Sequence, residues 1–74
     1  MVSEHPNQIK KLADIAADRE LPPDLRIKAV EQLGNIGNHE ALLALLELAA
    51  NQELATEERD VALQEAREII KSGH

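Results

Sequence analysis

The apolar residues of this chain recur every three or four positions in four separate stretches. This spacing places them on one side of a helix and predicts an all-α fold. Pro22 and Pro23 separate the first two stretches, because proline lacks a backbone N–H and disfavours helix in the preceding residue. Gly37 and Asn38 separate the next two, where they suit a left-handed helix end and an N-cap. Four helices are expected, over residues 6–18, 23–36, 39–50 and 57–71.

The helices are expected to differ in how much of their surface is buried. The third is apolar almost all round, so it should pack on more than one side, and a neighbouring loop should cover its Leu43. The fourth should have Thr56 as its N-cap and end near Lys71 and Gly73. The apolar face of the second helix comprises Leu25, Ala29, Val30, Leu33 and Ile36. That of the fourth comprises Val61, Ala62, Ala66, Ile69 and Ile70.

The second half of the chain repeats the first at an offset of 33 residues, with eight identical positions that the Ala and Leu content alone does not readily explain. A period of this length is typical of helical solenoids, whose repeats bury their apolar faces against each other. We therefore predict a single domain, 1–74, made of two copies of a helical hairpin, about 6–38 and 39–72. The identical pairs are Leu12/Leu45, Ala16/Ala49, Ala17/Ala50, Glu20/Glu53, Leu21/Leu54, Arg26/Arg59, Ala29/Ala62 and Ile36/Ile69.

A pattern of arginine, glycine and spaced aliphatic residues runs from the second helix into the third. It reads Leu25-Arg26-x2-Ala29-x3-Leu33-Gly34-x-Ile36-Gly37-Asn38-x2-Ala41-Leu42-x2-Leu45-Leu46. This pattern resembles the HEAT-repeat family, in particular the short HEAT-like repeats of phycobilisome-lyase-type proteins. The resemblance extends from about Asn7 to Ile70 and implies an α-α superhelix of two HEAT-like hairpins.

The resemblance also implies roles for individual residues. Arg26 and Arg59 would be the arginines that the family carries early in the second helix, paired with an acid near the inter-helix turn. In the first copy that acid would be Asp18 or Asp24. The second copy departs from the pattern at three positions, so we expect it to end the array. The departures are Asn51 for Asp18, Arg67 for Gly34 and Ile70 for Gly37.

The composition argues against several classes of function. With 74 residues, the chain has little core to spare for an active site. It contains no Cys, Phe, Tyr or Trp and has a net charge of −6, which argues against disulfides, thiolate metal sites and nucleic-acid binding. No stretch is long and apolar enough to span a membrane, and the first residues do not form a secretory signal. We therefore expect a cytoplasmic protein.

Motifs for catalysis and metal binding are missing from the sequence. The three histidines are His5, His39 and His74, and no two of them have the i, i+4 spacing of a helical metal site. The chain has no nucleophile motif and no phosphate-binding loop, and its carboxylates are spaced as a helix surface. The sequence thus predicts neither an enzyme nor a cofactor or metal site.

The resemblance places a binding surface on the second helix of each hairpin, where larger members of the family form a concave face. We expect this face to bind a protein partner whose identity the sequence does not give. Ile27 is either an exposed contact on this face or the edge of a wide buried face. The candidate residues are Ile27, Lys28, Glu31, Asn35, Asp60, Val61, Gln64 and Glu68.

The charge is distributed unequally between the two copies. Residues 1–38 hold six acids and five bases, for a net charge of −1, whereas residues 39–74 hold eight acids and three bases, for −5. A basic partner could dock on the acids of the fourth helix. The alternative is a solvated helix whose acids favour the positive end of the helix dipole. The acids concerned are Glu57, Glu58, Asp60, Glu65 and Glu68.

Two further functions compete with the adaptor or accessory-subunit hypothesis. The family resemblance also suggests an accessory component of a tetrapyrrole (phycobilin) lyase-type system, although the chain has no aromatic residue or cysteine for a bilin pocket. Alternatively, the protein self-associates as a homodimer. Solenoids usually need about three repeats, so either this chain is a marginal four-helix unit or something covers its open ends.

Overall fold

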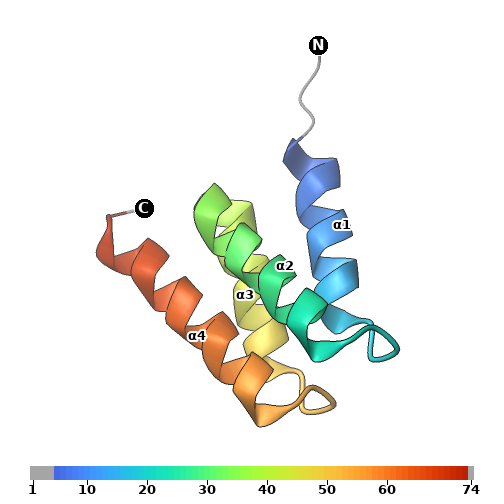
Figure 1. Ribbon diagram of the computed structural model, residues 1–74. Helices are drawn as coiled ribbons and strands as arrows, with labels where there is room; N and C mark the ends of the chain where they lie inside the picture. Colours follow the sequence, from blue (N-terminus) through green and yellow to red (C-terminus); the bar gives the residue numbers. More distant parts are fainter. Residues whose placement is uncertain (1–4, 74) are drawn as a thin grey trace.

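The computed structural model describes the backbone of residues 5–73 and the side chains of residues 8–73. Within this range the fold is all-α, without strands (Figure 1). The helix bounds agree with the predicted ranges to within one residue at each end, which confirms the prediction. The helices are α1 (His5–Ala17), α2 (Pro23–Ile36), α3 (His39–Ala50) and α4 (Thr56–Lys71).

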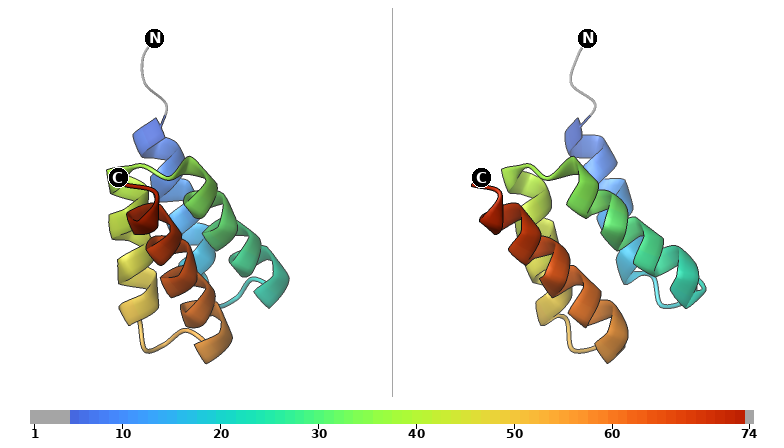
Figure 2. Two further views of the ribbon diagram at one scale, coloured as in Figure 1. Left: turned by 90° about the vertical axis from the view of Figure 1, so that its left-hand side faces the viewer. Right: turned by 60° about the vertical axis from the view of Figure 1, so that its left-hand side comes forward.

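The four helices form two antiparallel hairpins, α1–α2 and α3–α4, that pack against each other (Figure 1). Both hairpin turns lie at the same end of the molecule, and the α2–α3 connection lies at the other end (Figures 1 and 2). α2 and α4 run side by side, and so do α1 and α3. α3 packs against all three other helices, as expected from its nearly continuous apolar surface.

The two hairpin turns are held by the same hydrogen bonds at the 33-residue offset. In the first turn, the Asp18 carboxylate accepts from the backbone N–H of Glu20 at 3.0 Å. In the second, the Asn51 side-chain oxygen accepts from the backbone N–H of Glu53, also at 3.0 Å. Asp and Asn side chains both stabilise turns in this way. Asn51 in place of Asp18 therefore leaves the turn unchanged.

The α2–α3 connection follows the sequence prediction. Gly37 has a left-handed backbone with φ of 67°, and its N–H donates to the Leu33 carbonyl at 3.2 Å. Asn38 caps α3, because its side-chain oxygen accepts from the N–H of Ala41 at 2.8 Å. The predicted cap of α4 is wrong: Thr56 is already helical, and Ala55 occupies the N-cap position without a side-chain hydrogen bond.

The core lies where the two hairpins meet. Three expected core positions are instead exposed: Leu25 is 49% exposed, Leu43 49% and Ile70 56%. They lie on the outer sides of the hairpins, and no loop covers Leu43 as had been expected. The buried apolar residues are Ile9, Ala16, Ala29, Val30, Leu33, Ala41, Leu45, Leu48, Leu54, Ala62, Ala66 and Ile69.

Candidate functional site

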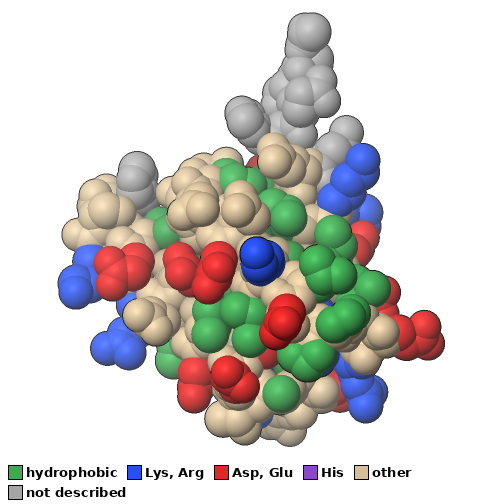
Figure 3. Space-filling view, in the orientation of Figure 1, with side chains coloured by type: hydrophobic (Ala, Val, Ile, Leu, Met, Phe, Trp, Pro, Cys, Tyr) green, Lys and Arg blue, Asp and Glu red, His purple; other side chains and the backbone are tan. Residues whose placement is uncertain are grey.

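α2 and α4 together form one face of the molecule, which is turned towards the viewer in Figures 1 and 3. Gly34 lets the two helices approach each other, because the Glu65 side chain lies directly over it. A methyl group at residue 34 would overlap the Glu65 carboxylate. The glycine of α2 thus leaves room for the Glu65 side chain between the second helices of the two hairpins.

Six of the eight predicted contact residues are exposed on this face: Lys28, Glu31, Asn35, Asp60, Gln64 and Glu68. We call these six the seam residues, because they flank the line along which α2 and α4 meet. The other two, Ile27 and Val61, are partly buried, and Val61 packs against the core. Ile27 therefore lies at the edge of a buried face and is not a fully exposed contact.

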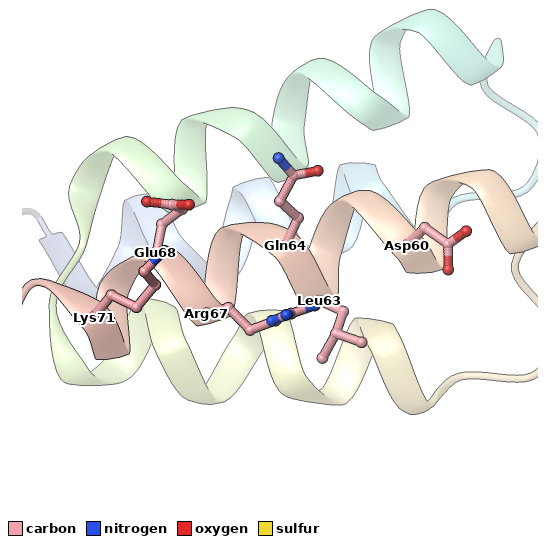
Figure 4. A pocket seen from close by; sticks show the side chains of 6 residues that line it. All are labelled: Asp60, Leu63, Gln64, Arg67, Glu68 and Lys71. Carbon is pink, nitrogen blue, oxygen red and sulfur yellow. The ribbon is translucent and has the colours of Figure 1, made fainter.

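Negative charge gathers along the seam. Burial raises the pKa of the Glu65 carboxyl, and the nearby carboxylates of Glu31 and Glu68 raise it further. Glu31 lies on α2 and the other two on α4, so both helices contribute. Gln64 and Glu68 turn towards α2 in Figure 4. The arrangement favours a cationic group over this part of the face.

Glu58 does not belong to the exposed acids, which corrects the predicted docking surface for a basic partner. It is only 2% exposed, and its carboxylate Oε1 lies 3.4 Å from Arg26 Nη1. Burial raises the pKa of the Glu58 carboxyl, and the adjacent Arg26 guanidinium offsets part of the rise. Neither carboxylate oxygen has a hydrogen-bond partner among the described residues, and Arg26 Nε has none either.

The predicted partners of the two arginines are also wrong. Arg26 pairs with Glu58 of the other hairpin, whereas Asp18 holds its own turn and Asp24 is exposed in the first turn of α2. Arg59 donates from Nε to the Ala49 carbonyl at 3.2 Å, within its own hairpin. One sequence signal pointed to Glu58: its counterpart 33 residues earlier is Leu25, an apolar residue.

The depressions found on the described residues are open to solvent. One of about 420 Å³ lies on α4 between the side chains of a single helix (Figure 4). Among the described residues, no group of three or more His, Asp or Glu side chains could hold a metal ion. His39 is exposed at the start of α3, and the side chains of His5 and His74 lie outside the described residues. The depression is lined by Asp60, Leu63, Gln64, Arg67, Glu68 and Lys71.

Comparison with known proteins gives no match: no family model, no curated protein and no solved structure matches this chain. The HEAT-like assignment therefore stays a prediction. None of the described helices has the length and apolar character needed to cross a bilayer.

Proposed function

We propose that this chain is a small HEAT-like protein-interaction module, an adaptor or accessory subunit that binds its partner on the face formed by α2 and α4. One observation carries the proposal. Six exposed polar side chains from both hairpins gather on this face, and none of them forms a side-chain hydrogen bond or ion pair with another described residue. Their hydrogen-bonding groups are therefore free for a partner.

The proposed partner presents a basic segment. Glu31, Glu65 and Glu68 repel one another across the seam, and a lysine or arginine side chain placed over them would relieve that repulsion. Only one seam residue, Lys28, is basic, so the charge of the face is predominantly negative. Attraction of this kind accelerates association and selects partners of opposite charge.

The proposed action is binding by shape and charge, without catalysis. The two depressions that border this face, of about 420 and 310 Å³, are open to solvent, and its polar groups are spread along two parallel helices. A reducing cytoplasm suits a chain without cysteine, and we place the module there.

Two charge-reversal variants test the location of the site. Glu31→Lys/Glu68→Lys changes the seam. Asp14→Lys/Glu47→Lys makes the same change in net charge away from the seam, where Asp14 of α1 and Glu47 of α3 line a separate depression. All four residues are exposed, so both variants should retain the helical circular dichroism of the wild type.

The immobilised wild type and both variants are used to capture proteins from a cell lysate, and the captured proteins are identified by mass spectrometry. We expect a protein that the wild type and the α1/α3 control retain in equal amounts and the seam variant loses. Equal retention by the folded seam variant, or equal loss from the control, would show that the seam is not the binding site.

A further inference from the structure

Two surfaces meet where the hairpins pack together: one on the first hairpin, which we call the α2 half, and one on the second hairpin, which we call the α4 half. On the α2 half, Arg26 and Gly34 receive the Glu58 and Glu65 side chains of α4, and Val30 is completely buried. The residues that lie 33 positions before or after each half in the sequence form a surface at one end of the molecule. Those two end surfaces can therefore be compared, residue by residue, with a contact that the fold already contains.

The α3/α4 end carries the counterpart of the α2 half. Leu63 corresponds to Val30, Arg67 to Gly34 and Ile70 to Gly37. Figure 4 shows Leu63 and Arg67 on the side of α4 turned towards α3 and away from α2. Four large apolar side chains of this hairpin are exposed: Leu43 (49%), Leu46 (40%), Leu63 (43%) and Ile70 (56%).

The α1/α2 end carries the counterpart of the α4 half. Leu25 corresponds to Glu58 and Gln32 to Glu65, whereas Ile15 corresponds to Leu48 of α3. These residues line an open, mainly apolar groove of about 240 Å³ between α1 and α2. In Figure 3, hydrophobic side chains gather on the flank of the molecule where α1 and α2 lie. Leu12, Lys28 and Ala29 complete the lining.

We propose that copies of this chain associate head to tail, with the α1/α2 end of one copy seated on the α3/α4 end of the next in the register of the internal contact. The occupant of each apolar end is thus a second copy of the same chain. The proposal goes beyond partner binding on the seam, because it uses the two ends of the molecule; the seam residue Lys28 also borders the α1/α2 groove.

The substitutions at the ends suit such a contact. Leu25 in the place of Glu58 removes the buried carboxylate, and Arg59, which corresponds to Arg26, already donates to the Ala49 carbonyl. Inside the molecule Glu65 lies near Glu31 and is repelled by it, whereas the residue that corresponds to Glu65 at the α1/α2 end is the neutral Gln32. The end contact therefore has Leu25 and Gln32 in place of the acids Glu58 and Glu65, and Asp60 in place of the partly buried Ile27.

Arg67 and Ile70 are bulky replacements, since they stand where Gly34 and Gly37 stand in the internal contact. The helices of two copies must then sit farther apart at this point than α2 and α4 do. In that position the guanidinium can donate to the side-chain oxygen of Gln32. The contact joins two different surfaces, so it does not close at a dimer, and the mean mass should keep rising with concentration.

Sedimentation equilibrium of the full chain tests the proposal with one blocking variant at each end. Leu25→Glu places a charge in the α1/α2 end, and Leu63→Glu places one in the α3/α4 end. Gln52→Glu adds the same charge in the exposed turn between α3 and α4, outside both ends. If Leu25→Glu or Leu63→Glu loses its helical circular dichroism, Leu25→Ser or Leu63→Ser, respectively, is used in its place.

Each blocking variant alone should remain at the mass of one chain, 8.2 kDa, whereas the wild type and Gln52→Glu should exceed it as concentration rises. A mixture of the two blocking variants should form a complex of two chains, because each retains the free end that the other lacks. A wild type that stays monomeric, a blocking variant that still associates, or a mixture that stays monomeric would each overturn the proposal.

Discussion

Removing the cation of the buried ion pair should destabilise the chain far more than removing both charges. In Arg26→Met, the Glu58 carboxylate would stay buried between the hairpins without a counter-ion. Breaking a buried pair in this way costs about 3–5 kcal/mol of unfolding free energy. The loss should shrink as the pH falls, because Glu58 can then bind a proton and enter the core uncharged.

The double variant Arg26→Met/Glu58→Leu should be as stable as the wild type or more stable. Replacing a buried ion pair by apolar side chains of similar volume is neutral or stabilises by about 1–4 kcal/mol. In the wild type the attraction is weakened by geometry, since the charged atoms lie 3.4 Å apart and both carboxylate oxygens lack hydrogen bonds. Leucine is also the residue that the first hairpin has at the corresponding position, Leu25.

Urea unfolding followed by far-UV circular dichroism measures these differences, because the chain has no tryptophan or tyrosine to report fluorescence. The Arg19–Glu53 pair is a matched control, with the same 3.4 Å separation but side chains 64% and 73% exposed. Arg19→Met/Glu53→Leu and its single variants should each change stability by less than about 1 kcal/mol. If the losses in Arg26→Met and Glu58→Leu simply add in the double variant, the two residues are not coupled and the reasoning fails.

Three further predictions concern acids and helix ends. The pKa of Glu58 and of Glu65 lies above the ordinary value of 4.5, so the folded chain binds these protons more readily than the unfolded chain. Their contribution to stability should therefore fall as the pH rises from about 4.5 through the raised pKa values, and Glu65→Gln should flatten that fall in urea titrations across pH. Asn38→Ala should cost about 1 kcal/mol through loss of the α3 cap, whereas Thr56→Ala, which removes no capping bond, should cost clearly less in the same assay. Gly37→Ala should lower the urea midpoint by an amount equivalent to about 1 kcal/mol, because alanine is strained at a φ of 67°; an unchanged midpoint would mean that the turn adopts another backbone conformation.

Local signals were sufficient to predict the helices and their order. The proline pair, Gly37 and Asn38 act on their own backbone and immediate neighbours. A few adjacent residues are therefore enough to predict their effect. The same kind of local signal gave the wrong cap for α4. Thr56 has the side chain of a cap, but the backbone places Ala55 at that position, and no sequence pattern distinguishes these two registers.

The burial of individual faces could not be predicted from periodicity. Leu25 and Ile70 lie on apolar stripes, yet they are exposed because the sides of the hairpins on which they lie have no neighbour in the chain. Glu58 has the sequence context of a solvated first-turn acid, and only the position of Arg26 in the other hairpin makes its burial tolerable. An amphipathic pattern says which side of a helix is apolar, but the packing of distant hairpins decides which apolar sides are covered.

The buried acid Glu58 would distinguish the internal contact from the proposed contact between copies. Within the chain, Glu58 meets Arg26; in a head-to-tail contact Leu25 takes the place of Glu58, and Arg59 is already engaged with its own hairpin. Our hypothesis is that the buried pair favours the internal contact over exchange of hairpins between copies, as buried polar groups fix the register of other helical assemblies. The Arg26→Met/Glu58→Leu variant would then keep its stability but exchange hairpins and associate more strongly than the wild type. Equal masses for the two proteins across the concentration range would show that the ion pair does not contribute to this selectivity.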